Sequence, residues 1–369
     1  MSDYKFDSRL ERAATLPAHY YIDPAVLQNE QRNVFARTWQ LAGRAEQVRA
    51  AGDFFTASLA GEPLLIVRGN DGTLRALSNV CRHRAGPVAK GEGKRPVLQC
   101  GYHGWTYTLD GRLLKTPEMQ GIECFDQRAF ALPEFRVDVW NDLVFVNLDR
   151  DASPLREFLG DLGEKFDKRT NSGFHLAARK EWMIDCNWKV YVDNYLEGYH
   201  IPIVHPGLFR EIDYPSYRTE TRRNYSIQHA PLKRPERIRA EAKDDEAEYF
   251  WVYPNLMINV YPDNFSTNLI VPLGQERTLT LFEWFFRDAP QATVDQTVAF
   301  SDEIQIEDIG ICEAVQRGLR SSTYTSGRYS PARENGVHHF HAMYAESMGI
   351  ATSSALLPAG GEKVPRSGG

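Results

Sequence analysis

Residues 81–103 hold the stretch that decides the fold of the first half of the chain. It reads Cys81-Arg82-His83, runs on for sixteen residues, and closes with Cys100-Gly101-Tyr102-His103. Each arm offers one thiolate and one imidazole, and each lies beside glycine or a hairpin signal, where tight metal-binding loops are found. Two cysteines and two histidines can hold a tetrahedral zinc ion. They can also hold a 2Fe–2S cluster in which histidines replace two of the cysteines.

The order of the ligands separates these alternatives. Zinc fingers place their cysteines together and their histidines later, whereas each arm here is a cysteine followed by a histidine. That order suits two irons that are each served from both loops, which is the pattern of a Rieske 2Fe–2S centre. The sequence therefore favours a Rieske centre, which takes up single electrons from a ferredoxin-like donor.

Short apolar runs around this motif predict an antiparallel β domain over residues 43–150. Turn signals join the runs in pairs, and Asp110-Gly111 is a preferred two-residue hairpin turn. The pairs are Leu64–Val67 with Thr73–Leu77, Trp105–Leu109 with Arg112–Leu114, and Val137–Trp140 with Leu143–Leu148.

Composition limits the class of protein. The 369 residues suit two domains, and 42% hydrophobic with 25% charged residues is typical of a globular chain. A net charge of -6 argues against nucleic acid and anionic membrane partners. No apolar run approaches the ~20 residues of a membrane span, and the N-terminus lacks a signal core. Five cysteines, an odd number, indicate a reducing compartment, so we expect a cytoplasmic protein.

A second candidate site lies in Asn187–His205. At helical spacing, Asp193, Glu197 and His200 share a face beside an aromatic stripe. Pro202 predicts that the helix ends at about Ile201, after which His205 can turn back beside His200. The two imidazoles could form half of a metal site; a helix end with two surface histidines is the alternative, since a lone His-x4-His is a weak motif.

A third ligand could come from the helix predicted over residues 293–319. Four residues at spacings of four, three and four should share one face of this helix. They are Ile304, Asp308, Ile311 and Val315, so Asp308 stands in an otherwise apolar stripe. An unpaired carboxylate in an apolar stripe is costly, and a bound cation would remove that cost. Pairing with Arg317 or Arg320 is the alternative.

Together these motifs resemble the large (α) subunit of Rieske non-haem iron oxygenases over about residues 25–345. The resemblance implies an α+β fold, with an antiparallel β Rieske domain inserted in a helix-grip (START/Bet v1-like) catalytic domain. The expected parts are an N-terminal helical segment of the catalytic domain (1–42), the Rieske domain (43–150), the catalytic domain (155–357) and a flexible tail (358–369). Asp23-Pro24 predicts a helix start, and that helix should run to about Trp39.

The resemblance also assigns ligands. It implies that the 2Fe–2S cluster is bound by Cys81, His83, Cys100 and His103, and mononuclear Fe(II) by His200, His205 and Asp308. Glu307-Asp308, ahead of residues 312–318, matches the family's iron-binding pair. Glu197 stands where the family usually has Asp, and it is expected to bridge His200 to a Rieske histidine of a neighbouring subunit in a head-to-tail homotrimer. Asn194, in the same motif, is a further catalytic candidate.

Glutamate at position 197 resembles the branch that acts on quaternary ammonium compounds such as carnitine, choline and betaines. Residues 253–262 and 336–341 also resemble that branch. The implied reaction uses O2 to hydroxylate or N-dealkylate a small quaternary ammonium substrate. No GxGxxG fingerprint is present, so a separate NAD(P)H-dependent flavin/iron–sulfur reductase must supply electrons. The alternatives are hydroxylation or demethylation of an aromatic acid, a Rieske electron carrier without oxygenase activity, and a zinc-binding interaction module.

Some residues receive expectations of their own. Aromatic faces could hold the cation, and the candidates near the site are Phe250, Trp251, Tyr253, Tyr261, Phe265 and Trp284. The histidines at 338, 339 and 341 are expected to be structural or on the surface. Cys124, Cys186 and Cys312 are expected to be buried thiols. The run Phe250–Tyr261 is expected to form a strand, and residues 154–168 a helix.

Overall fold

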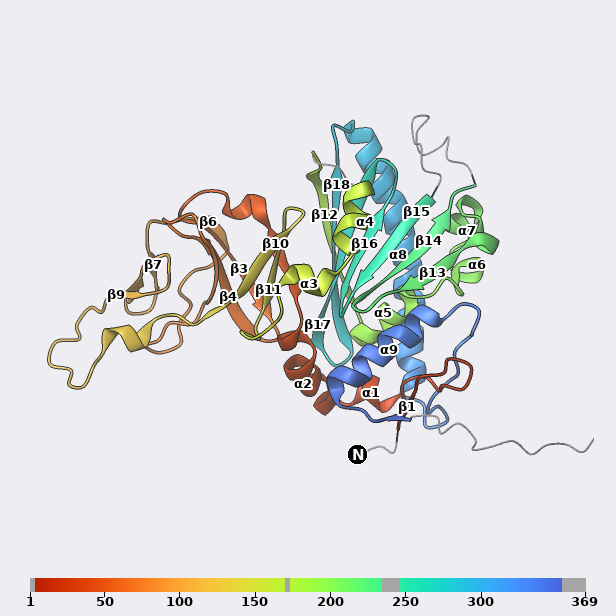
Figure 1. Cartoon of the computed structure of the whole chain (residues 1–369), viewed down its shortest axis with the longest axis horizontal. Coiled ribbons are helices and arrows are strands. Elements are labelled where there is room, and N and C mark those ends of the chain that lie inside the picture. The colour runs from red at the N-terminus through yellow and green to blue at the C-terminus, as the bar shows by residue number, and fades with distance from the viewer. Residues whose placement is uncertain (1–3, 170–172, 234–245, 354–369) are drawn as a thin grey trace, which may run out of the picture.

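The computed structural model describes residues 4–169, 173–233 and 246–353, which form two lobes built on separate antiparallel sheets (Figure 1). The expected tail, residues 358–369, lies outside the described residues. So does most of the charged run between Lys233 and Glu248, a predicted solvated helix or loop. Among the helices that the structure describes, none has both the length and the apolarity of a membrane-spanning segment.

The first lobe contains the Cys/His stretch. Its larger sheet has the order β2-β11-β10-β5-β4-β3-β6, and a three-stranded sheet, β7-β8-β9, carries the outer end. The strands are β2 (Gln40–Arg44), β3 (Asp53–Leu59), β4 (Glu62–Arg68), β5 (Leu74–Ser78), β6 (Glu92–Lys94), β7 (Leu98–Gln99), β8 (Thr106–Tyr107), β9 (Leu113–Lys115), β10 (Glu134–Trp140) and β11 (Leu143–Asn147).

All three predicted hairpins are present in this lobe as β4–β5, β8–β9 and β10–β11. In the last, Trp140 pairs directly with Leu143. Asn141 and Asp142 form the two-residue turn with φ of 49° and 60°, a left-handed conformation that suits the right-handed twist of the strands. Local turn chemistry therefore sets the register of the β10–β11 hairpin.

The second lobe is a seven-stranded antiparallel sheet wrapped around helices. The order is β12-β18-β17-β16-β15-β14-β13, and the long helix α8 (Gln291–Leu319) runs along it (Figure 1). The strands are β12 (His175–Ile184), β13 (Arg218–Thr221), β14 (Tyr225–Pro231), β15 (Glu246–Val252), β16 (Leu256–Val260), β17 (Asn264–Gly274) and β18 (Arg277–Phe286). The other helices are α3 (Leu155–Leu159), α4 (Leu162–Arg169), α5 (Trp188–Tyr195), α6 (Ile201–Val204), α7 (Pro206–Glu211) and α9 (Asn335–Met348).

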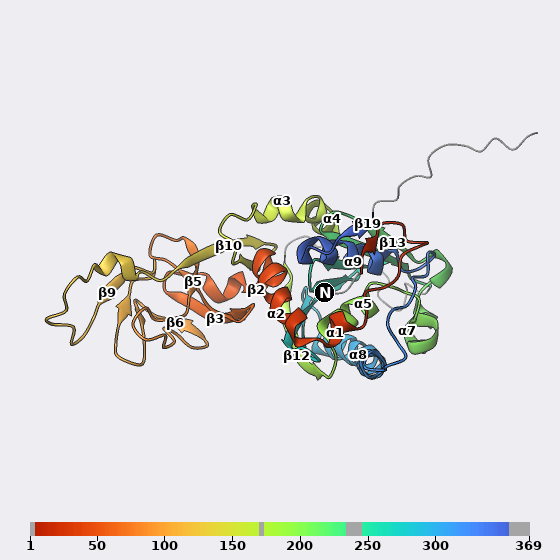
Figure 2. The same ribbon diagram turned by 90° about the horizontal axis from the view of Figure 1, so that it is seen from below.

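The N-terminal segment belongs to the second lobe. Its helices α1 (His19–Ile22) and α2 (Pro24–Asn33) lie beside α9 and α5 (Figure 2). Glu30 of α2 is fully buried and accepts hydrogen bonds from Lys189 Nζ at 2.6 Å and Tyr344 Oη at 2.6 Å. Strand β1 (Phe6–Asp7) also pairs with β19 (Thr352–Ser353) near the other end of the described chain. The described chain thus begins in the second lobe, leaves it to form the first lobe, and returns.

Three predicted boundaries were wrong. Helix α2 ends at Asn33, well before Trp39. The chain turns there because Phe35 packs in the core, where the centroids of its ring and the Trp188 ring are 5.0 Å apart. The helix predicted over residues 154–168 is split into α3 and α4 at Gly160, whose φ is 58°. The single strand predicted over residues 250–261 is part of the β15–β16 hairpin, which turns at the cis bond between Tyr253 and Pro254.

Candidate active site and metal centres

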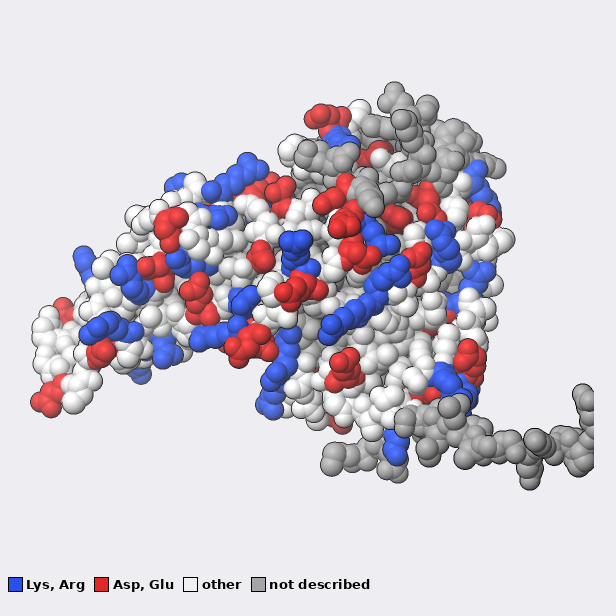
Figure 3. All heavy atoms as spheres, in the orientation of Figure 1, with Lys and Arg blue, Asp and Glu red and all other residues white. Residues whose placement is uncertain are grey.

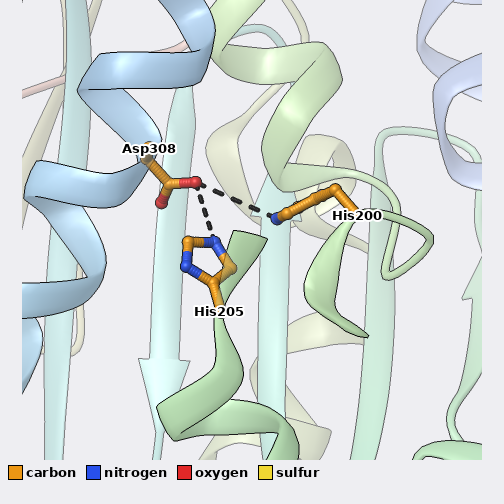
Figure 4. Close-up of side chains that lie close together, drawn as sticks. All are labelled: His200, His205 and Asp308. Carbon is orange, nitrogen blue, oxygen red and sulfur yellow. Dashed lines mark hydrogen bonds and ion pairs between the residues drawn. The ribbon is translucent and has the colours of Figure 1, made fainter. Parts of the chain in front are cut away.

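The structure brings His200, His205 and Asp308 together in the second lobe (Figure 4). Asp308 Oδ1 lies 3.0 Å from His205 Nε2 and 3.9 Å from His200 Nε2. One ligand atom from each side chain lies within 4.8 Å of the others. Arg320, one of the alternative partners for Asp308, pairs instead with Glu276. Two imidazoles and one carboxylate on one side of a cavity are a donor set that fits Fe(II) with positions left open.

The two histidines flank α6, in a segment that departs from the prediction. Helix α5 ends at Tyr195, well before the expected Ile201. The Glu197 carboxylate accepts hydrogen bonds from the backbone N–H groups of Tyr199 and His200, which gives the chain an alternative to further helix. Glu197 Oε1 also lies 2.6 Å from His200 Nδ1. The acid therefore both stops the helix and orients an imidazole.

Further polar groups hold the other two members of the triad. Glu307 Oε2 lies 2.7 Å from His205 Nδ1, and Asn194 Nδ2 donates to Asp308 Oδ1 at 2.6 Å. Burial alone would lower the pKa of His205, but the Asp308 and Glu307 carboxylates raise it above its usual value. Both imidazoles thus have a carboxylate on Nδ1 and turn Nε2 toward Asp308, as metal-bound histidines commonly do.

The Cys81-x-His83 and Cys100-x2-His103 loops also converge. Both cysteines are buried, and the imidazole rings of His83 and His103 have centroids 4.7 Å apart. His83 Nδ1 is buried without a hydrogen-bond partner, as expected for an atom that faces a metal. Desolvation, His103 and Arg84 lower the pKa of His83, which keeps the imidazole neutral and able to ligate.

Close packing supports these loops. Trp105 stacks on His83 with centroids 4.8 Å apart, and Tyr107 Oη lies 3.2 Å from Cys81 Sγ. A Cβ added to Gly86 would lie 3.1 Å from Cys100 Sγ, so the glycine leaves room around the thiolate. Two buried thiols, two adjacent imidazoles and one unpaired ring nitrogen fit a 2Fe–2S cluster.

Comparison with known proteins decides the family. Residues 38–126 match the Rieske [2Fe-2S] domain, and residues 172–350 match the ring hydroxylating alpha subunit catalytic domain. Choline monooxygenase of Arabidopsis thaliana chloroplasts is 36% identical over 92% of this chain and 84% of that protein. The chain belongs to the Rieske non-haem iron oxygenases. The oxygenase subunit of carnitine monooxygenase from Escherichia coli K12 is 32% identical to this oxygenase, over 92% of it and 96% of the relative.

Solved structures agree with this placement. CntA, a quaternary ammonium Rieske monooxygenase crystallised with its substrate L-carnitine, aligns with a TM-score of 0.83 and 29% identity, over 93% of this oxygenase and 98% of CntA. Naphthalene 1,2-dioxygenase from a Rhodococcus species shares the fold with a TM-score of 0.77 at 20% identity, over 90% and 94% of the two chains. The α+β fold and the two cofactors expected for this family, a 2Fe–2S cluster and mononuclear iron, are thereby confirmed.

A cavity of about 440 Å³ opens beside the triad of this oxygenase. Strands β14–β18 and helices α5–α8 contribute residues to its wall. Of the six aromatic residues expected near the substrate, Tyr261 and Trp284 line it. Phe250 and Phe265 pack on the opposite side of the sheet, because neighbouring strand residues face opposite sides. Trp251 and Tyr253 pack against Phe340 of α9 instead. Four further tyrosines, which the sequence analysis did not single out as substrate contacts, also line the cavity: Tyr191, Tyr195, Tyr217 and Tyr249.

The charge in this cavity has one sign. Glu211 and Asp263 line it in addition to Glu197 and Asp308, and no Lys or Arg is among the described residues that line it. The outer surface differs, because acidic and basic side chains alternate over the face shown in Figure 3. The cavity therefore offers a cation a negatively charged environment. The face shown in Figure 3, where acidic and basic side chains are mixed, does not.

A second cavity, of about 260 Å³, lies on the other side of Asn194, Glu197 and His200. It is bordered by Asp193 and the fully buried His341, whose Nε2 lies 2.9 Å from Asp193 Oδ1. His341 is thus structural, as expected for the C-terminal histidines. His338 Nε2 lies 2.9 Å from the Asp7 carbonyl oxygen.

Two further expectations have clear outcomes. Cys186 and Cys312 are buried as expected, but Cys124 is exposed in a turn with a φ of 55°, because apolar character alone does not decide burial in a loop. Glu307 was recognised in sequence only as the neighbour of Asp308. Its hydrogen bond with His205 joins residues 102 positions apart in the chain. The only feature of the sequence that could have suggested this contact is the position of Glu307 beside the candidate ligand Asp308.

Proposed function

We propose that this oxygenase uses O2 and two electrons to oxidise a small quaternary ammonium compound in the 440 Å³ cavity. The observation that carries the proposal is the combination of tyrosine faces and carboxylates, with no Lys or Arg among the described lining residues. The named activities of the relatives, choline and carnitine monooxygenation, support the same substrate class.

In this proposal His200, His205 and Asp308 hold the iron, and Cys81, His83, Cys100 and His103 hold the cluster. Iron supplies the capacity to activate O2 when it is bound. The protein contributes orientation: Glu307 fixes His205, and Asn194 fixes Asp308 through the 2.6 Å hydrogen bond.

The cation would be recognised by aromatic faces. Tyr249 and Tyr261 have ring centroids 6.0 Å apart at 69°, and their hydroxyl oxygens are 3.2 Å apart. Burial raises the pKa of Tyr217, Tyr249 and Tyr261, so the phenols stay neutral at ordinary pH. A cation over such a ring gains roughly 0.5–2 kcal/mol. Hydroxylation of a C–H bond next to nitrogen would give a hemiaminal that collapses to an amine and an aldehyde.

Electrons would reach the iron from a neighbouring subunit. His103 is exposed, and Tyr102 beside it is 60% exposed. Next to His200, Tyr199 and Ile203 are 57% and 85% exposed. A head-to-tail homotrimer would bring such surfaces together, with Glu197 between His103 of one subunit and His200 of the next. A separate NAD(P)H-dependent reductase would feed the cluster; a cytoplasmic location remains a prediction.

Oxygen uptake with a surrogate reductase tests the substrate class. We expect turnover with choline, carnitine or betaines, formation of the matching amine or aldehyde product, and little uptake with aromatic acids. The variant Asp308→Ala gives the background rate. Turnover of aromatic acids, with none of any quaternary amine, would contradict the proposal.

A further inference from the structure

Strands β13, β14 and β15 carry a second group of metal-type ligands on the face away from the substrate cavity. Gln228 and Tyr249 line the cavity, so their neighbours His229 and Glu248 point to the opposite face of the sheet. His229 is 7% exposed and pairs across the strands with Glu248. Glu246 lies two residues away on the same face.

Three carboxylates surround the His229 ring. Nδ1 lies 3.2 Å from Glu246 Oε2 and 3.5 Å from Glu248 Oε1. Nε2 lies 3.5 Å from Glu220 Oε1 and is buried without a hydrogen bond. One ligand atom from each of His229, Glu246 and Glu248 lies within 4.8 Å of the other two.

Two arginines orient the carboxylates. Arg218 Nη1 binds the other oxygen of Glu246 at 2.9 Å, and Arg222 Nη2 binds the other oxygen of Glu220 at 3.0 Å. Each of these glutamates therefore keeps one oxygen toward the imidazole.

The spacings differ from those of hydrogen-bonded pairs elsewhere in the chain. The carboxylates of Glu197 and Glu307 approach their histidines to 2.6 Å and 2.7 Å, as charge-assisted hydrogen bonds do. The hydrogen bond between His229 Nδ1 and Glu246 is longer, at 3.2 Å, and the contacts of His229 with Glu248 and Glu220 are both 3.5 Å. Bonds of about 2.0–2.2 Å to a tetrahedral ion place its ligand atoms roughly 3.3–3.6 Å apart, close to the separations around Nδ1.

We propose that His229 Nδ1, Glu246 and Glu248 bind a first-row divalent cation of the Mn²⁺ or Zn²⁺ class. Imidazole with carboxylates is a donor set that suits these ions. Glu220 then accepts the proton of Nε2 and orients the ring, as outer carboxylates do for metal-bound histidines. The ion would tie β14 to β15 directly and β13 through His229, behind the wall of the substrate cavity.

Mn²⁺ is the probe for two reasons. It binds weakly to thiolates, so the cysteines should not compete for it, and EPR measures the concentration of unbound Mn²⁺ directly. Asp308→Ala in the full-length, cluster-containing protein serves as the background and removes binding at the iron site. We expect this variant to bind one Mn²⁺ per chain and to gain about 2–4 °C in Tm with Mn²⁺. Adding His229→Gln should weaken Mn²⁺ binding at least tenfold and abolish the gain.

His175→Gln, which changes an exposed histidine on β12 of the same sheet, is the matched control and should leave Mn²⁺ binding unchanged. Glu248→Gln checks the result without altering the imidazole and should also weaken binding. No Mn²⁺ bound by the Asp308→Ala protein would overturn the proposal and leave His229 a structural partner of the three carboxylates. Equal binding after His229→Gln would overturn it as well.

Discussion

The two cofactor-binding regions of this oxygenase present their histidines in opposite ways. In the first lobe the cysteines are buried, while His103 is exposed at the tip of its loop. In the second lobe His205 is 2% exposed and faces an internal cavity. A cluster with an exposed histidine edge can exchange electrons with another chain, whereas a buried triad controls what reaches the metal. The exposed region thus suits electron entry, and the buried region suits substrate oxidation.

The two regions also differ in how they are assembled. The Cys/His loops are held by hairpins close in sequence, with their own core around Leu77 and Trp105. The triad joins segments 103 residues apart, and its core includes residues of the N-terminal segment. We therefore expect damage to one centre to leave the other intact, and the following variants test this independence.

Cys100→Ser should have the largest effect. Loss of one thiolate should abolish the visible Rieske spectrum and all reductase-driven turnover, while the mononuclear iron site remains. Absorption and EPR spectra with iron analysis measure this. Cys124→Ser, at an exposed thiol, is the control and should behave like the wild type. An unchanged spectrum in Cys100→Ser would refute the cluster assignment.

Asp308→Ala should give the converse result. The cluster spectrum should persist, mononuclear iron should be lost, and turnover should fall at least about 1,000-fold, because the metal supplies several kcal/mol of catalysis. Iron content per subunit and oxygen uptake measure the effect. Retention of three irons per subunit together with activity would place the third ligand elsewhere.

Glu197→Gln should keep both cofactors and slow the link between them. The amide is close in size to the carboxylate, but the charge-assisted hydrogen bond to His200 Nδ1 is lost. We expect Rieske reoxidation to slow roughly 10–100-fold, measured by stopped-flow mixing of reduced protein with O2 and substrate. Reoxidation at the wild-type rate would show that Glu197 acts only as the stop of helix α5.

Glu307→Gln should have the smallest effect. It weakens the 2.7 Å contact that orients His205 but leaves all three ligands in place. We expect about a tenfold loss in iron affinity, with electron transfer from the cluster unchanged in iron-loaded protein. Iron titration of the apo-site measures it. A loss as large as that of Asp308→Ala would make Glu307 itself a ligand.

Local patterns predicted much of this protein. The three hairpins of the first lobe follow from local turn signals, such as the two-residue turn at Asn141 and Asp142, which needs no distant contact. The Cys81 and Cys100 arms have fixed spacing within one small domain, so their order alone favoured a Rieske centre. Asp308 was identifiable because a carboxylate in an apolar helical stripe needs a partner.

Contacts between distant segments decided the rest. The end of helix α5 depended on the Glu197 side chain bonding backbone N–H groups, which a proline rule did not anticipate. Only the curled sheet selected Tyr217 and Tyr249 for the cavity and sent Phe250 and Trp251 to the cores. The sequence by itself determined which candidate ligands the chain offers, because metal-binding residue types and short turns are local. The tertiary structure decided which side chains meet, because burial and orientation depend on the strands and helices that pack around them.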